Sequence, residues 1–382
     1  MKKTFATLLA LSMALSLEAG AESAYPIEIE SDWGTAVIES EVNAIAVYDL
    51  GMLDILDTLG FGDYVVAVTS GLAMPDYLSD YAGDFYVDLG GFKDWDQDAL
   101  AECNPDLILA GFRQTKSVDV VDAVAPAIYF AAGDVDSSEE YMAALEKRVN
   151  AITTLFGGEE TAQEYLDQIQ EMIDTVQSYT AENEVSFICV TCEDGGLSLG
   201  ANNSNALLSG ALGFISAYEE EDNEEEGRGG DGGREESADE GGIAEDAEAD
   251  GEVRGGGDGQ DDASIEDAEA DGEIRGGGDG LDDVSIEEEE TEDRTAQNAE
   301  VVQTITDAAP TYVFVFDKDA GENMAEAVSA QEVVESTELA DTELYQNGNI
   351  IYMDEALWYS ADGGLTSTIM QLEQIIDLLG LE

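Results

Sequence analysis

Residues 104–114 read NPDLILAGFRQ, an apolar run set between a proline turn and a glycine-containing loop. The continuous apolar run at 107–110 predicts a short strand that is buried on both faces. Arg113 and Gln114 follow at its carboxyl end, where α/β proteins bind their ligands. These two residues are therefore candidate ligand contacts, and a cation at that place suggests an anionic ligand. Arg113 can also be interpreted as pairing with a nearby carboxylate.

The alternation of strands and helices continues on both sides of this run. Strands are expected at 43–48, 64–68 and 127–130, and helices at 50–59, 98–103 and 118–124. A long helical pattern covers 138–156, is broken by Gly157 and Gly158, and resumes at 160–179. After it come strands at 185–192, 312–316 and 350–353, and helices at 205–212, 299–308, 323–334 and 365–379. Such alternation indicates parallel sheets.

The expected fold class is α/β, with two Rossmann-like lobes bridged by a long helix and a disordered acidic insertion in the second lobe. The expected parts are a signal peptide at 1–21, an N-terminal lobe at 34–137, a bridging helix at 138–158, a C-terminal lobe at 159–382 and the insertion at 219–293.

The amino terminus has the pattern of an export signal. Lys2 and Lys3 precede an apolar run at 5–17, and the small residues Ala19 and Ala21 mark a cleavage site. No cysteine follows the run, so we expect no lipoprotein anchor. We expect an exported protein of the periplasm or cell envelope.

The composition excludes several classes of function. The chain has 88 acidic residues against 13 basic ones, a formal charge of −75, which argues against binding nucleic acid or anionic lipid. It contains no histidine, which excludes Ser-His-Asp and Cys-His catalysis and histidine-rich metal sites. We therefore expect no enzyme, no catalytic residue and no protein-ligated metal in the lobes.

Cys189 and Cys192 match the C-x-x-C redox motif, but they fall within a predicted strand. Residues three apart on a strand face opposite sides of the sheet. We therefore interpret them as two ordinary strand cysteines.

The insertion has 34 acidic and 4 basic residues, 17 glycines and no aromatic residue, a composition typical of disorder. A decapeptide at 245–254 recurs at 266–275, and residues 256–263 and 277–284 both fit the calcium nonapeptide pattern. Stacked calcium turns repeat every nine residues, whereas these copies are 21 apart. Calcium binding at the acidic repeat is a possibility beside loose cation condensation on a solvated tract.

Several blocks outside the insertion, in the right order, resemble the extracytoplasmic siderophore-binding proteins of ABC importers. They are residues 46–60, 104–114, 125–129, 312–317 and 356–365. The resemblance implies two lobes joined by a rigid helix, a ferric catecholate complex held between them, and docking of the loaded protein on a membrane permease. Asp98 is a candidate contact for permease arginines.

The resemblance further implies three cations around the anionic ferric complex. Arg113 matches the first position, Asn205 stands at the second, and Lys318 replaces arginine at the third. Asparagine keeps a donor without the charge, and lysine keeps the charge without the bidentate fork. Lys318 lies between Asp317 and Asp319, so a surface ion pair is an equal interpretation.

Trp358 and Tyr359 are the remaining candidate ligand contacts, because a tryptophan ring can stack on a catecholate and a tyrosine can reach the iron shell. Packing in the core or at its rim is the alternative for both. The predicted function is capture of a ferric siderophore, with catecholate as the preferred type, by a monomer that delivers it to an ABC permease. The alternatives are a haem or corrinoid binding protein, and a secreted calcium-binding or interaction protein acting through the acidic repeat.

Overall fold

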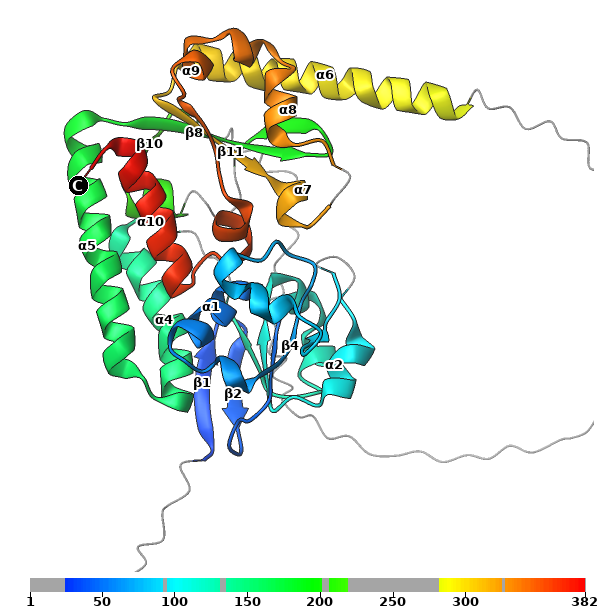
Figure 1. Cartoon of the computed structure of the whole chain (residues 1–382), viewed down its shortest axis with the longest axis vertical. Coiled ribbons are helices and arrows are strands. Elements are labelled where there is room, and N and C mark those ends of the chain that lie inside the picture. Colours follow the sequence, from blue (N-terminus) through cyan, green and yellow to red (C-terminus); the bar gives the residue numbers. More distant parts are fainter. Residues whose placement is uncertain are drawn as a thin grey trace, which may run out of the picture. The chain divides into compact units, whose positions relative to one another are not determined.

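The computed structural model describes residues 25–381, apart from 92–94, 131–134, 201–205, 219–281 and 325–326. Side chains are described for these residues except at 112–113 and 282–292. The predicted signal peptide, Asn205, most of the acidic insertion and the side chain of Arg113 thus lie outside the described residues. The described part of the chain contains two mostly parallel sheets with flanking helices, and a two-stranded antiparallel hairpin (Figure 1).

The first sheet has the strand order β5-β4-β3-β6-β7, and all its pairs are parallel. Its strands are β3 (Ile45–Val47), β4 (Val65–Val68), β5 (Val87–Asp88), β6 (Leu107–Ala110) and β7 (Ala127–Tyr129). The helical segments between them are α1 (Leu50–Thr58), η1 (Gly62–Tyr64), η2 (Asp76–Ala82), α2 (Gln97–Cys103), η3 (Phe112–Ser117) and α3 (Val118–Val121). The predicted strand at 107–110 has the predicted bounds and is buried at all four positions.

A β-hairpin that the sequence did not predict precedes this sheet. Strands β1 (Ile27–Ser31) and β2 (Gly34–Ile38) pair antiparallel, and the backbone N–H of Asp32 at their turn donates to the carbonyl of Tyr129 (2.9 Å). The hairpin is thereby attached to the carboxyl end of β7.

The second sheet has the order β10-β8-β11-β12, with β9 paired antiparallel to β8. Its strands are β8 (Ser186–Glu193), β9 (Gly196–Leu199), β10 (Ile215–Ser216), β11 (Tyr312–Asp317) and β12 (Ile350–Tyr352). The helical segments around it are η4 (Ala206–Ala211), α6 (Asp282–Ala308), α7 (Lys318–Gly321), α8 (Ala330–Glu335), η5 (Glu338–Asp341), α9 (Glu343–Gln346), η6 (Ala356–Ser360) and α10 (Leu365–Leu379).

Two long helices connect the sheets. α4 (Ser138–Phe156) begins at the cap formed by Ser137, whose Oγ accepts from the backbone of Glu140 (3.2 Å). Gly157 and Gly158, both at positive φ, separate it from α5 (Glu159–Asn183), because glycine adopts this conformation without strain. α5 runs beside α10, and α10 contacts α1 of the first sheet (Figure 1).

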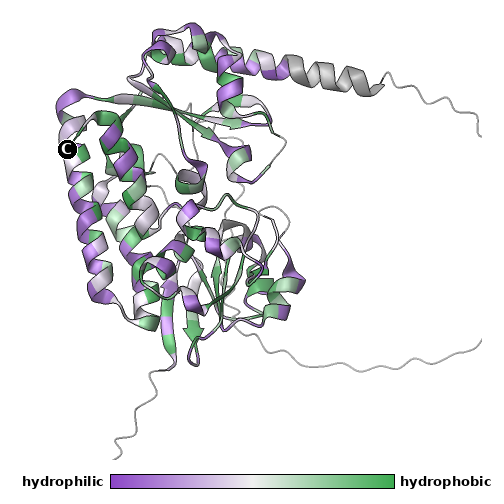
Figure 2. Ribbon diagram, in the orientation of Figure 1, coloured by the Kyte–Doolittle hydropathy of each residue, from purple (hydrophilic) through white to green (hydrophobic). Residues whose placement is uncertain are grey.

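The core follows the period-two alternation of the strands. On β8, Phe187 and Cys189 belong to a central cluster that also holds residues of the first sheet, whereas Ile188 and Cys192 belong to a separate cluster on the opposite face. The prediction that Cys189 and Cys192 face opposite sides is confirmed, and both thiols are buried and free. Figure 2 shows hydrophobic residues along the strands and hydrophilic ones on the outer surface of α5.

Two helix predictions in the second lobe were wrong. Of the helix expected at 323–334, the described residues are helical only in α8 (Ala330–Glu335), whose start Ser329 caps. The preceding helix α7, which Asp317 caps through Ala320 N (3.1 Å), ends at Gly321, and Asn323 follows it at φ 55°. α6 begins at Asp282 and not at 299, within the acidic segment. Glutamate is a good helix former and is favoured in the first turns by the helix dipole.

The predicted fold class is confirmed: the chain is a mixed α/β protein with parallel sheets and helices. The boundaries of the lobes and of the bridging helix stay predictions. Across the described residues, no helix combines the length and the apolar character needed to cross a membrane.

Candidate functional site

Both sheets have a topological switch point, where the connections that follow two neighbouring strands run in opposite directions along the sheet. In the first sheet it lies at β3 and β6, because β3 pairs with β4 on one side and with β6 on the other. In the second it lies at β8 and β11. Ligands of open α/β sheets bind outside the carboxyl ends of strands at such points. The loop that carries Arg113 follows β6, and Lys318 follows β11.

The loop after β6 is shaped by Gln114. Its Oε1 accepts the backbone N–H of Gly111 (3.1 Å), and the backbone N–H of Gln114 donates to the Gly111 carbonyl (3.1 Å). The side chain is 3% exposed, so Gln114 holds the turn into η3. This fixes the backbone of residues 112–113 at the strand end, which is the place the sequence predicted for Arg113.

Lys318, the first residue of α7, pairs with Glu193 at the end of β8 (Nζ to Oε1, 2.6 Å). Its side chain is 20% exposed. The ion pair that we had weighed for Lys318 therefore exists, with Glu193 as the partner in place of its chain neighbours. The carboxylate of Glu193 therefore neutralises part of the charge of Lys318.

Trp358 and Tyr359 lie in η6, with different surroundings. Trp358 is 2% exposed, its indole Nε1 donates to Gln374 (2.7 Å), and its ring meets Phe316 edge-on at 6.5 Å. These contacts match the alternative that Trp358 packs in the core. Its ring therefore has no exposed face on which a ligand could stack. Tyr359 is half-buried against the backbone of Gly321, and its hydroxyl donates to Glu322 (3.2 Å). Of the two rings, Tyr359 is the better placed to meet a ligand.

Asp98 is exposed in the first turn of α2, beside the Asp96 cap that accepts from Ala99 N (2.9 Å). It lies on α2, which packs against β4 and β5 of the first sheet.

Loops from the two sheets meet directly at their carboxyl ends. The backbone N–H of Ala73, in the loop after β4, donates to the carbonyl of Gly321 (2.8 Å). The amide of Asn323 donates to the carbonyls of Ser70 (3.2 Å) and Leu72 (2.8 Å). We call this contact the loop clasp. It joins the loop after β4 of the first sheet to the segment that follows β11 and α7 of the second.

A second joint involves a residue that the sequence did not single out. Asp54 of α1 is fully buried, and its carboxylate accepts three backbone N–H groups at the start of α10, from Leu365 (2.6 Å), Thr366 (3.0 Å) and Ser367 (2.9 Å). The hydroxyl of Tyr77 also donates to it. Burial raises the pKa of Asp54, and these hydrogen bonds oppose the rise. A carboxylate at a helix N-terminus satisfies groups that otherwise lack partners.

Arg148 of α4 anchors the start of α1. Its Nη2 lies 2.7 Å from Oδ1 of Asp49, the cap residue that follows β3, and its guanidinium lies over the ring of Phe130 (5.8 Å). Arg148 therefore joins a connecting helix to the carboxyl ends of β3 and β7.

Glu355 lies just before η6 and is 9% exposed. Its Oε1 accepts the backbone N–H of Asp317, and its Oε2 is buried and has no hydrogen-bond partner among the residues that the structure describes. Burial raises the pKa of Glu355 to about 8, and the carboxylates of Asp317 and Asp354 add to the rise. Glu355 links the residue before Lys318 to the helix that carries Tyr359.

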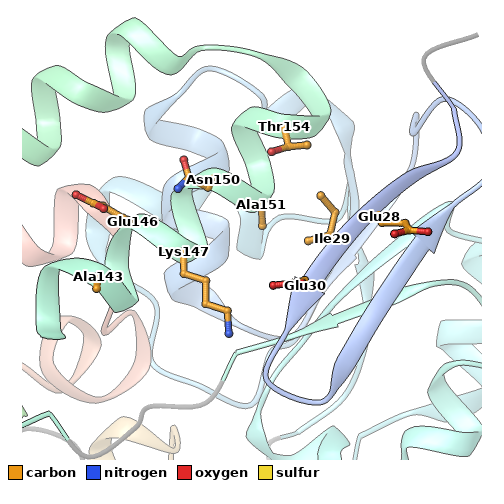
Figure 3. A pocket seen from close by; sticks show the side chains of 9 residues that line it. All are labelled: Glu28, Ile29, Glu30, Ala143, Glu146, Lys147, Asn150, Ala151 and Thr154. Carbon is orange, nitrogen blue, oxygen red and sulfur yellow. The ribbon is translucent and has the colours of Figure 1, made fainter.

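In the described part of the chain, no three Cys, Asp or Glu residues are grouped so that they could hold a metal ion. A groove of about 320 Å³ lies elsewhere, between β1 and α4 (Figure 3). Its lining is Glu28, Ile29 and Glu30 from β1, and Ala143, Glu146, Lys147, Asn150, Ala151 and Thr154 from α4. It contains none of the predicted site residues, and Lys147 is paired with Asp32.

Sequence reasoning missed Asp54, Arg148, Glu355 and Asn323. Each acts through a partner that is distant along the chain, so no local motif marks it. Only Arg148 carried a usable signal, as a rare cation on a helix that the pattern had placed between the lobes.

Comparison with known proteins agrees with this fold. The petrobactin-binding protein YclQ of Bacillus subtilis is 26% identical over 339 residues, covering 88% of this chain and 82% of that protein. Its crystal structure matches with a TM-score of 0.64 at 23% identity, covering 93% of this chain and 99% of that one. The periplasmic catecholate-siderophore binding protein VctP of Vibrio cholerae matches with a TM-score of 0.61 at 18% identity, covering 92% and 99%. Residues 45–239, just over half of the chain, match the model of one family, and the chain belongs to that family, the periplasmic binding proteins.

Proposed function

We propose that this chain is the binding component of an ABC importer that captures a ferric siderophore outside the cytoplasm and delivers it to the permease, without a catalytic step. The observation that carries the proposal is the loop clasp. It joins the loop after β4 of the first sheet to the segment that follows β11 in the second. The Arg113 loop after β6 and Lys318 after β11 follow strands at the switch points of the two sheets, which supports a ligand site there. Family membership and the similarity to the petrobactin-binding protein YclQ support the same function.

Within this function we place a catecholate complex first. Arg113 is the cation for the catecholate oxygens, because an anion that leaves water requires fixed opposite charge and donors. Lys318 and Asn205 complete the polar contacts, and Tyr359 supplies an aromatic edge. Gln114 stabilises the Arg113 loop through its hydrogen bond to Gly111. Trp358 is buried in the core and anchors the helix that carries Tyr359.

The remaining parts of the proposal concern delivery. Residues 1–21 direct export, the mature chain acts as a monomer, and Asp98 on α2 meets a cation of the permease. An exposed carboxylate outside the core can be replaced without loss of stability. Asp98→Asn should therefore leave siderophore affinity unchanged and lower only the transport rate.

Intrinsic tryptophan fluorescence tests the binding step. The full chain is titrated with a ferric catecholate, a ferric hydroxamate, haem and cobalamin, and the ferric catecholate should quench at the lowest concentration. Arg113→Ala should weaken its binding by about tenfold or more, since a charged hydrogen bond contributes about 1.5–3 kcal/mol.

Lys116→Ala is the matched control, because Lys116 is an exposed cation on the same short helix, η3. It should change the affinity by less than about twofold. A flat response of the native chain to all four compounds would contradict the proposal. Quenching by haem or cobalamin alone would replace the siderophore with one of those ligands.

A further inference from the structure

The carboxyl end of the second sheet gathers acidic side chains around Lys318. The segments that meet there are 193–194, 317–322 and 354–355, and Lys318 is their one cation. Their acids, which we call the strand-end acidic cluster, are Glu193, Asp194, Asp317, Asp319, Glu322, Asp354 and Glu355.

These acids interact with one another. The backbone N–H of Asp194 donates to Asp319 (2.7 Å), and Lys318 pairs with Glu193. Burial raises the pKa of Asp319, and the neighbouring carboxylates of Asp194, Asp317 and Glu193 add to the rise. The acids of these segments outnumber their one lysine by seven to one, and that lysine is already paired with Glu193. We therefore expect this side of the candidate site to repel anions.

Most members of the cluster have a structural role. Both carboxylate oxygens of Asp317 accept backbone N–H groups, from Ala320 (3.1 Å) and Ala330 (2.7 Å). Glu322 accepts the hydroxyl of Tyr359, and Asp354 accepts the N–H of Ala356 (3.1 Å). The fold accounts for these acids without any ligand.

Glu355 is the exception. One of its oxygens accepts the N–H of Asp317, whereas Oε2 is buried and has no partner in the described part of the chain. Glu355 lies close enough to Asp317 and Asp354 to be affected by their charges. A buried polar atom without a hydrogen bond costs about 1–3 kcal/mol. The fold alone does not account for this oxygen, and a donor from a ligand would satisfy it.

We propose that the transported ferric chelate carries a protonated amine, which lies against the strand-end acidic cluster and donates to Oε2 of Glu355. This deepens the proposed function and rests on it. The chelate would face the Arg113 loop and Lys318 with its anionic, iron-binding part, and Glu355 with its cation. The site selects against chelates that are anionic on all sides, because the cluster repels them.

The proposal has a consequence for protons. With a pKa of about 8, Glu355 is mostly protonated at pH 7. An ammonium group at Oε2 favours the carboxylate and lowers this pKa, while Asp317 and Asp354 are the charged neighbours that oppose the change. Binding of an amine-bearing chelate at pH 7 should therefore release close to one proton per ligand.

The test uses two synthetic tris-catecholamide chelators that are identical except that one carries a primary amine on its scaffold. The ferric complexes of the two are compared. Calorimetry of the full chain at pH 7, in buffers of different ionisation enthalpy, gives affinity and proton release together. The amine-bearing complex should bind about tenfold tighter and release the proton. In Glu355→Gln the preference and the proton release should both be lost.

Glu335→Gln is the matched control, since it makes the same change of charge at an exposed position of the second lobe. It should retain the preference and the proton release. Asp354→Asn, an exposed member of the cluster, should reduce the preference even if Glu355→Gln does not fold.

Equal affinity for both complexes, tighter binding of the amine-free complex, or an unchanged proton count in Glu355→Gln would overturn this inference and leave the proposed function intact. Failure of both complexes and of a ferric hydroxamate to bind would overturn the proposed function as well.

Discussion

The carboxylate of Asp54 lies 2.6 Å from the backbone nitrogen of Leu365, although the two residues are 311 positions apart in the chain. The contact fixes α1, which follows the first strand of the first sheet, to the start of the last helix. A Cβ atom at Gly364 would lie 2.5 Å from Cγ of Asp54, so this position requires glycine for the close approach. The joint is buried, and it limits how far the two sheets can move apart.

Asp54→Ala should therefore destabilise the protein strongly. It leaves three backbone N–H groups at the start of α10 without their partner, and we expect the free energy of unfolding to fall by about 3 kcal/mol. Urea unfolding followed by circular dichroism measures the change. Asp377→Ala removes an exposed acid from the same helix and should stay within about 0.5 kcal/mol of the native value. Equal effects of the two variants would show that Asp54 does not hold α10.

The loop clasp predicts a local effect of Asn323→Gly. Asn323 has φ 55°, which glycine adopts without strain, so the variant removes the hydrogen bonds to Ser70 and Leu72 without disturbing the backbone. The amide of Ala73, which donates to Gly321, should exchange about fivefold faster with solvent deuterium, a loss of about 1 kcal/mol in local stability. Met324→Ala changes the exposed neighbouring residue and should leave that rate unchanged. Unaltered exchange in Asn323→Gly would mean that the clasp does not depend on this side chain.

Glu355 predicts a pH dependence of stability. Its pKa is about 8 in the folded protein, above the ordinary value of 4.5, so the folded state binds the proton more tightly than the unfolded state. The stability from this group is complete below about pH 4.5 and is lost as the pH rises towards 8, by up to about 1.4 kcal/mol per pH unit.

Glutamine stays neutral at every pH and keeps an oxygen for the N–H of Asp317. The difference in unfolding free energy between Glu355→Gln and the native chain should therefore grow in favour of the variant between pH 5 and pH 8. Urea titrations at four pH values measure it. A constant difference over this range would refute the raised pKa.

The ion pair of Lys318 predicts a gain of affinity. Glu193→Gln removes the partner that neutralises the lysine, so the binding of an amine-free ferric catecholate should tighten by about threefold. Fluorescence quenching gives the affinity. Glu338→Gln makes the same charge change at an exposed site and should have no effect. The gain should vanish in the double variant Glu193→Gln, Lys318→Gln, and its persistence there would exclude Lys318 as the cause.

The candidate site was only partly predictable from the sequence. The Arg113 loop and Lys318 follow strands whose bounds the apolar pattern gave to within a residue, and this places both at carboxyl strand ends. Such an apolar pattern does not predict the contacts that each side chain makes. The sequence offered Trp358 as a ligand contact with core packing as the alternative, and only its neighbours Phe316 and Gln374 place it in the core.

The sequence alone determined the α/β class, the parallel sheets and the long helices, because hydrophobic periodicity and glycine or proline breaks act over a few residues. It also located the two opposite-facing cysteines of β8. The tertiary structure decided which acids cap helices, which form ion pairs, and which one, Glu355, buries a carboxylate oxygen with no hydrogen-bond partner among the described residues. Asp54, Asp317 and Glu355 look alike in a chain with 88 acidic residues. They differ in burial and in their hydrogen-bond partners. For Asp54 and Glu355 these partners are distant along the chain, so no local sequence pattern predicts them.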